Sequence, residues 1–293
     1  MAPKMQSAME YLMTYGWAIL AIAIVMVSLY SLGIFNAGSL QPTATPGSCQ
    51  VVKTAAQTSL AGQCGNLIPK YVAQFSSSSS NVLTSGTMNL PSPISVSVFL
   101  WVKPSTGYGP GGGGVNGQSM LSIGTTGSGN MYDINSGSLG VDIWGGCTGM
   151  TASTSALTSS KWYFVGYVYT AGTPSMSYYI NGAAAGTATL SCTLHEGSNL
   201  PVIIGSPPSS SSDSSYSGAI ADVQIYNTSL DNTTIKALYQ EGIGGAPIDL
   251  KHLVGWWPLN GNANDYSGNN NQGTTTSVIW NANWQSGYTS PTS

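Results

Sequence analysis

The sequence predicts a long N-terminal α-helix followed by an all-β head, an antiparallel β-sandwich. Residues 11–35 carry no charge and are mostly apolar. From residue 71 onward, short stretches that alternate apolar and polar residues are separated by clusters of glycine, serine, asparagine and proline, a pattern typical of antiparallel strands and turns. Within this second part, residues 230–240 alone have helical spacing.

Residues 11–35 could be a simple N-terminal membrane anchor. As a helix they would extend about 37 Å at about 1.5 Å per residue, enough to cross a bilayer core of about 30 Å. Lys4 on the short side favours an internal N-terminus and an external head. A cleaved secretory signal peptide fits less well, because its apolar stretch is only about 7–15 residues long.

The string QSAMEYLMTYGWAIL, preceded by Lys4 and by the junction of Met5 and Gln6, resembles the class III signal peptides of archaeal type IV pilins and archaellins. The resemblance implies that a prepilin peptidase removes residues 1–5 and leaves Gln6 first. Glu10 then becomes the fifth residue, where pilins carry a glutamate. Met5 departs from the family, which usually has Gly or Ala before the cut. The resemblance also implies a pilus assembly machinery and a filament core made of copies of the helix.

The carboxylate of Glu10 needs a partner in an apolar environment, because burying it unpaired is costly. Cleavage before Gln6 would create an α-amino group that could neutralise Glu10 on the same or a neighbouring helix. Pairing between neighbours would also fix the axial register of the copies. Alternatively, Glu10 lies in the lipid headgroup region without a specific role.

The composition limits the partners of the head. Only 6% of the residues are charged and the net charge is −3, against about 25% charged residues in typical soluble domains. The seven lysines are scattered and arginine is absent. This excludes a nucleic-acid surface, which requires clustered basic side chains.

Cysteines and glycosylation sequons both fit an external head. Of the three pairings that four cysteines allow, we favour Cys49 with Cys64 in the neck and Cys147 with Cys192 across the head. The chain has no CxxC motif for a zinc site. Sequons beginning at Asn227 and Asn232 are glycosylation candidates.

Local signals place the strands and one short helix in the head. Asn181 and Gly182, after an apolar run, predict a type I′ hairpin turn. Asp231 is the expected N-cap of the helix at residues 230–240. Strands are expected at residues 71–75, 94–102, 120–123, 131–134, 139–144, 162–169, 176–180, 183–190, 202–204, 219–226, 254–259 and 276–280.

A series of motifs in the head resembles the laminin G-like or concanavalin A-like lectin jelly roll. They are ISVSVFLWVKP, KWYFVGYVY, SYYING, IIGS, YSGAIADVQIYN and WWPLNGNANDYSGNNNQG, in this order. The WWPLNGNANDYSG segment opens the fold in that family and closes the chain here, as in a circular permutation. Alternatively, this strand completes the sheet of the next subunit by strand addition.

The head is not expected to be an enzyme, although the same architecture hosts glucanases. Retaining glycosidases need two carboxyl groups about 5–5.5 Å apart. The E-x-D-x-x-E strand of that family is absent, and the acidic residues of the head are isolated from each other in sequence. We expect Asp222 to hold a turn.

One turn-rich loop gathers the oxygen donors Asn260, Asn262, Asn264 and Asp265. They could bind Ca²⁺, which takes 6–8 oxygen ligands. With one carboxylate among them, we favour instead a set of Asx turns that close the loop.

These observations divide the chain into a leader (1–5), a hydrophobic helix (6–36), a neck with a small disulfide collar (37–66) and a β-sandwich head (67–293). We expect a subunit of an archaeal type IV pilus-like filament. It would be held in the cytoplasmic membrane as a precursor, then assembled with its head displayed for adhesion to glycans or surfaces. The alternative is an unpolymerised surface protein, anchored by the uncut helix and binding carbohydrate.

Overall fold

The computed structural model describes residues 5–31, 42–65, 67–76, 81–84, 88–90, 95–105, 118–125, 128–135, 138–143, 150–151, 157–172, 175–190, 197–207 and 214–291. The chain divides into two compact units, Met1–Pro42 and Thr43–Ser293.

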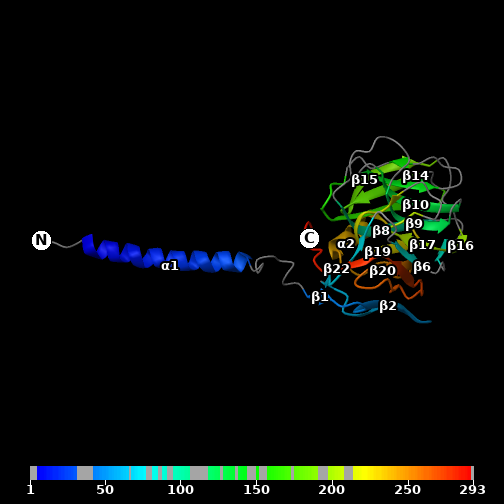
Figure 1. Cartoon of the computed structure of the whole chain (residues 1–293). Helices are drawn as coiled ribbons and strands as arrows, with labels where there is room; N and C mark the ends of the chain where they lie inside the picture. The colour runs from blue at the N-terminus through cyan, green and yellow to red at the C-terminus, as the bar shows by residue number, and fades with distance from the viewer. Residues whose placement is uncertain are drawn as a thin grey trace. The chain divides into compact units, whose positions relative to one another are not determined.

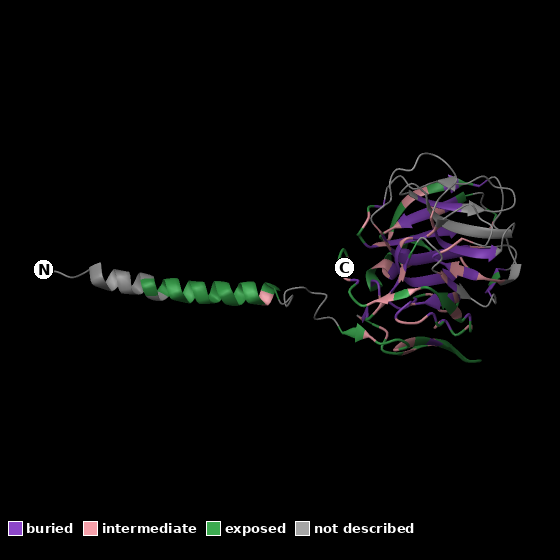
Figure 2. Cartoon of the chain, viewed as in Figure 1, coloured by how far each residue is buried: buried purple, intermediate pink, exposed green. Residues whose placement is uncertain are grey.

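The first unit contains helix α1 (Met5–Ser31), drawn in blue in Figure 1. Its described side chains are almost all exposed, as the green part of the helix in Figure 2 shows. Across the described residues, the chain contains no helix with both the length and the apolar character required to cross a membrane. Lys4 lies outside the described residues, and so do the side chains of Met5, Gln6 and Glu10, although these three belong to the helix.

The second unit is built on two large sheets, which are antiparallel except for one short parallel strand. In the β19 sheet the strand order is β15 (Ala183–Thr189), β14 (Ser175–Ile180), β13 (Tyr163–Tyr169), β8 (Val96–Pro104), β19 (Gly218–Tyr226), β5 (Val72–Phe75) and β22 (Ile279–Asn281), with β20 (Leu253–Trp257) also paired to β19. In the β9 sheet the order is β12 (Met150–Thr151), β11 (Ser138–Ile143), β10 (Ser128–Asn135), β9 (Gln118–Thr125), β17 (Val202–Ile204), β6 (Asn81–Thr84) and β21 (Gly273–Thr276), with β18 (Ser214–Ser215) parallel to β9. Three small sheets pair β1 (Thr43–Ala44) with β4 (Ile68–Pro69), β2 (Cys49–Lys53) with β3 (Thr58–Gly62), and β7 (Met88–Leu90) with β16 (Gly197–Leu200).

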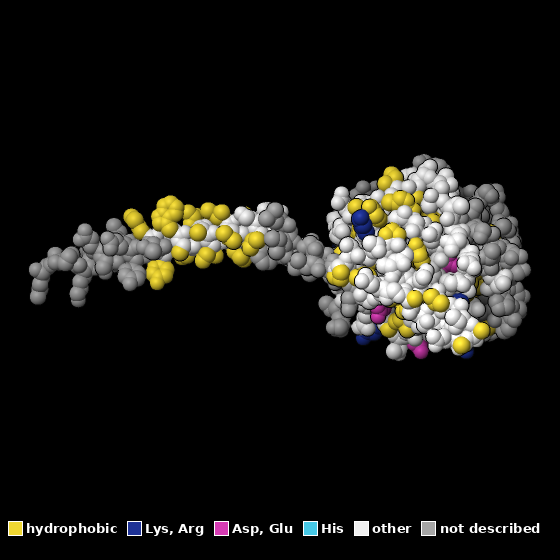
Figure 3. Space-filling view, turned by 90° about the horizontal axis from the view of Figure 1, so that it is seen from below, with side chains coloured by type: hydrophobic (Ala, Val, Ile, Leu, Met, Phe, Trp, Pro, Cys, Tyr) yellow, Lys and Arg dark blue, Asp and Glu magenta, His cyan; other side chains and the backbone are white. Residues whose placement is uncertain are grey.

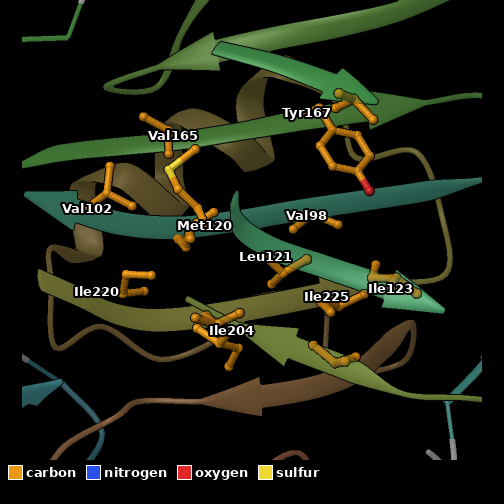
Figure 4. Close-up of a cluster of buried hydrophobic side chains, with 14 of the residues drawn as sticks. Val98, Val102, Met120, Leu121, Ile123, Val165, Tyr167, Ile204, Ile220 and Ile225 are labelled. Atoms are coloured by element: carbon orange, nitrogen blue, oxygen red, sulfur yellow. The ribbon is translucent and has the colours of Figure 1, made fainter. Parts of the chain in front are cut away.

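The main hydrophobic core lies between the two large sheets. Alternate residues of each strand point inward, because side chains of a strand alternate between its two faces. Figure 4 shows apolar side chains of β8, β13 and β19 gathered with those of β9 and β17. The residues labelled there are Val98, Val102, Met120, Leu121, Ile123, Val165, Tyr167, Ile204, Ile220 and Ile225. The predicted sandwich of antiparallel sheets is thus confirmed.

A second core covers the other face of the β19 sheet. Helix α2 (Asn232–Glu241) places Ile235 and Leu238 there. The β2–β3 hairpin adds Val51, and the C-terminal segment adds Trp284, whose indole donates to the carbonyl of Pro69 over 2.9 Å. From Thr43 onward, the segment expected as a collar therefore belongs to the same compact unit as the sandwich.

Two local predictions are confirmed. Asn181 and Gly182 have φ values of 51° and 74° between β14 and β15, the left-handed pair that a type I′ turn requires. Asp231 caps α2, and its carboxylate accepts a hydrogen bond from the N–H of Thr234 over 2.7 Å.

The closing strands all pair within their own unit. Strand β20 joins β19, β21 joins β6, and β22 joins β5. One side of β19 is bordered first by β5 and then by β20, with Asp222 between the two pairings. This segment of β19 and the loop after β20 together position the candidate site.

Candidate functional site

The loop between β20 and β21 is organised by one buried carboxylate. Oδ1 of Asp265 accepts hydrogen bonds from the N–H groups of Trp256 (3.1 Å) and Ser267 (2.8 Å). Oδ2 accepts from the hydroxyl of Ser267 (2.9 Å) and the N–H of Asn271 (2.8 Å). A carboxylate has about four acceptor positions, so the loop itself uses all of them.

Of the other predicted oxygen donors, Asn260 and Asn262 are also engaged, whereas the side chain of Asn264 makes no hydrogen bond to the described part of the chain. Oδ1 of Asn260 accepts from the N–H of Tyr71 over 2.9 Å, and Oδ1 of Asn262 accepts from the N–H of Asn264 over 3.1 Å, an Asx turn. The donor set therefore does not fit Ca²⁺, and the arrangement is that of turns closing a loop. In the described parts of the chain, no three His, Cys, Asp or Glu residues come together as a metal site.

The β2–β3 hairpin is fastened to this loop along one side. The N–H of Val51 donates to the carbonyl of Tyr266 over 2.8 Å, and the ammonium of Lys53 donates to Oδ1 of Asn269 over 2.7 Å. The predicted Cys49–Cys64 disulfide closes the base of the hairpin. Two segments far apart in sequence thus become the two walls of one surface feature.

Between these walls lies an open groove of about 470 Å³. We call it the hairpin groove. Its polar character follows from the side chains that line it, since few of them are apolar. They are Gln50, Val51, Val52, Lys53, Asn264, Asp265, Tyr266, Gly268, Asn270 and Gln272.

A second, smaller cavity of about 30 Å³ lies beside Asp222 and Trp256. Asp222 has a φ of 50° within an irregularity of β19. The residue expected to hold a turn therefore lies at a buried irregularity of a strand and not in an exposed loop. The indole of Trp256 donates to its Oδ1 over 2.8 Å, and the amide of Gln224 donates to both oxygens. Burial raises the pKa of the Asp222 carboxyl to about 7, and these hydrogen bonds from Gln224 and Trp256 partly oppose the shift.

The remaining predicted sites of the second unit are the cysteines Cys147 and Cys192 and the sequon residues Asn227 and Asn232. Cys147 and Cys192 lie outside the described residues. Asn227 and Asn232 are both exposed, as glycosylation would require, and Oδ1 of Asn232 accepts a hydrogen bond from the hydroxyl of Tyr179 over 2.8 Å.

Comparison with known proteins places the sandwich in a family. The family described as the Concanavalin A-like lectin/glucanases superfamily matches residues 76–236. The chain belongs to this superfamily. No curated protein matches its sequence.

Solved structures share the concanavalin A-like fold at low sequence identity. One is a protein from Bacteroides ovatus ATCC 8483 assigned as carbohydrate-binding, with a TM-score of 0.53 and 15% identity over 78% of this chain. The present chain spans 65% of that protein's length. Another is the native heptameric SAP-like pentraxin from Limulus polyphemus, with a TM-score of 0.51 and 14% identity over 72% of this chain and 94% of the pentraxin. At these identities the likeness shows the concanavalin A-like fold alone.

Sequence reasoning missed the hairpin groove of this concanavalin A-like chain. Its walls come from segments that are distant in sequence, with 216 positions between Lys53 and Asn269. The amide-rich string at residues 260–272 was the available signal. We interpreted that string as a metal site or a set of turns because nothing local indicated an opposite wall.

Proposed function

We propose that this protein is a structural subunit of a type IV pilus-like extracellular filament with an adhesive, lectin-like head. Helix α1 packs against copies of itself in the filament core, after a precursor stage at the cytoplasmic membrane and removal of residues 1–5. The second unit is displayed outward and binds glycans. Its C-terminal WWPLNGNANDYSG segment completes the sandwich in the same chain, as a circular permutation of the family's order.

The observation that carries the proposal is that α1 is apolar around its whole circumference. Ile24, Val25, Met26 and Val27 are consecutive and are 58%, 55%, 51% and 68% exposed. Successive residues of a helix are about 100° apart, so these four point in four directions. A helix that is apolar on all sides must be covered on all sides. Figure 3 shows apolar side chains along both visible edges of the helix.

The adhesive part of the proposal rests on the superfamily. The matched family includes lectins in its description, and the Bacteroides protein with the same fold is assigned as carbohydrate-binding. The face of the second unit drawn in Figure 3 carries few charged side chains. Such a surface favours uncharged, hydroxyl-rich ligands.

The mature N-terminus tests the assembly part. Mass spectrometry of surface material should find chains that begin at Gln6. If chains beginning at Met1 or Ala2 persist in membranes and no filaments form, the proposal is wrong. The protein is then the alternative of the sequence analysis, an unpolymerised anchored surface protein.

The role of Glu10 is tested by Glu10→Gln, with Glu241→Gln as the matched control. Glu241 is an exposed carboxylate at the end of α2, so its replacement by Gln removes one negative charge as Glu10→Gln does, but outside helix α1. We expect Glu10→Gln to reduce filament formation while the control assembles normally. Normal filaments from Glu10→Gln would remove the proposed pairing with the α-amino group of Gln6.

A further inference from the structure

We infer that the hairpin groove is a binding site for neutral saccharides that does not require a metal ion. The inference rests on the proposed glycan-binding role of the head and assigns that role to a place and a ligand class. Its volume of about 470 Å³ lies within the range of about 300–1,000 Å³ that is typical of ligand sites.

Three amide side chains in the groove are free to bind a ligand. Gln50, Asn264 and Asn270 line it, and their side-chain amides make no hydrogen bond to the parts of the chain that the structure describes. Each amide offers a carbonyl acceptor and two N–H donors. A sugar hydroxyl is likewise both donor and acceptor, so it can pair with either end of each amide.

The groove also offers an apolar surface. Val52, which is 37% exposed, lines one wall, and Tyr266 belongs to the opposite wall. A pyranose ring has C–H groups that can pack on such side chains while its hydroxyls reach the amides. Amides beside apolar side chains therefore match the mixed surface of a sugar.

The charges of the groove are compensated within the protein, which favours a neutral ligand. The ammonium of Lys53 donates to Oδ1 of Asn269 and to the carbonyl of Leu253 over 3.2 Å, and Asp265 lies close enough to act on it electrostatically. The Asp265 carboxylate is itself fully hydrogen-bonded within its loop. Neither charge is left for an ionic ligand to neutralise.

The walls are fixed before any ligand arrives. At Gly268, which has a φ of 77°, a Cβ atom would lie 3.0 Å from the carbonyl oxygen of Val51, so the loop and the hairpin are in close backbone contact. The Val51 to Tyr266 hydrogen bond holds the same contact, and the Cys49–Cys64 disulfide closes the base of the hairpin. Pre-formed sites lose less conformational freedom on binding and gain affinity from it.

The test uses the full chain in a detergent without a sugar headgroup, because a glycosidic detergent would compete. An array of neutral oligosaccharides of hexose and N-acetylhexosamine units, and of acidic ones with uronic or sialic acid, is probed in EDTA. The best neutral glycan is then titrated against wild type and against the double variant Gln50→Ala, Asn264→Ala. Asn270 is left in place, because its φ of 61° would strain a replacement.

The matched control is Gln57→Ala, Gln240→Ala. It removes two exposed amides that do not line the groove. We expect neutral glycans to bind in EDTA, the groove variant to bind about tenfold more weakly, and the control to bind as wild type does. All three chains should unfold at the same temperature.

The outcomes separate this inference from the function on which it rests. If the groove variant binds neutral glycans as wild type does, the groove is not the site, although glycan binding by the head stands. If wild type binds acidic glycans only, or loses binding in EDTA, the assigned ligand class or the metal independence is wrong. If wild type binds no glycan, the adhesive part of the proposed function fails with the groove.

Discussion

The indole N–H of Trp256 donates a hydrogen bond to Oδ1 of Asp222 over 2.8 Å, where β19 changes its partner from β5 to β20. The same carboxyl accepts from Gln224, which in turn accepts from the hydroxyl of Tyr226. A buried polar network therefore fills the gap between two backbone pairings. Its acid has a pKa of about 7, raised chiefly by burial.

This raised pKa predicts a pH-dependent stability that Asp222→Asn should remove. The pKa of Asp222 rises from 3.8 to about 7 on folding. Between about pH 4 and pH 7, the folded protein keeps a proton that the unfolded chain has released. The free energy of unfolding should therefore fall as the pH rises, by up to about 1.4 kcal/mol per pH unit from this group, and then level off. Asparagine tolerates the left-handed φ of this position.

Urea unfolding of wild type and Asp222→Asn at several pH values between about 4 and 8 measures this effect. The difference between the two proteins isolates Asp222 from the other titrating groups. The variant should gain stability relative to wild type as the pH rises. Parallel curves would mean that Asp222 has an ordinary pKa in the folded protein.

Replacing Asp265 should destabilise the head more than replacing any other residue of its loop. Asp265→Ala leaves the N–H groups of Trp256, Ser267 and Asn271 without their acceptor in a buried environment. We expect a loss of about 3–5 kcal/mol in the free energy of unfolding. Denaturant unfolding checks this, with Asn264→Ala as the control, for which we expect less than about 0.5 kcal/mol. If EDTA lowers the wild-type stability by a similar amount, the carboxylate has a metal-binding role that contradicts the geometry.

Removing the disulfide should loosen the hairpin without abolishing the fold. Cys49 and Cys64 are 15 positions apart, and a loop of this size corresponds to about 3 kcal/mol. The double variant Cys49→Ser, Cys64→Ser should unfold at lower denaturant concentration and show faster amide exchange in β2 and β3. Unchanged exchange there would mean that the contacts of Val51 and Lys53 hold the hairpin by themselves.

Alanine substitutions at two glycines should distinguish the cost of backbone strain from the cost of steric overlap. Gly172 and Gly182 have φ values of 76° and 74°. A Cβ atom at Gly172 would meet no described atom within 4 Å, whereas one at Gly182 would lie 2.9 Å from Cβ of Tyr239. Gly172→Ala should cost about 1 kcal/mol of strain, and Gly182→Ala should cost at least about 1 kcal/mol more. Thermal unfolding of both variants checks the difference, and equal losses would show that Tyr239 moves aside freely.

The features that could be predicted from the sequence are those that depend on a few adjacent residues. The turn at Asn181 and Gly182 depends on two neighbouring φ values, and the cap at Asp231 depends on an N–H three positions away. The strand expected at residues 254–259, an apolar run between turn residues, is present as β20 at Leu253–Trp257.

Features that join distant segments could not be predicted in this way. Asp222 and Trp256 are 34 positions apart. Their hydrogen bond depends on β20 pairing with β19 directly after the stretch of β19 that pairs with β5. The hairpin groove needs residues 50–53 to meet residues 264–272, and nothing in either string indicates the other. The same reason explains why the sequence suggests a neck and collar at residues 37–66, apart from the head, although the chain from Thr43 onward belongs to the compact unit of the sandwich.

The late position of β20, β21 and β22 has a consequence for biosynthesis. Each of these strands pairs with a partner made earlier, and Trp284 fills the second core. The ribosome synthesises the chain from its N-terminus, so one edge of each partner strand stays unpaired until the final segment emerges. A polypeptide that stops before residue 273 would leave the edges of β5 and β6 open and Pro69 without its indole donor. Prematurely terminated products should thus remain protease-sensitive, whereas finished chains should resist proteolysis.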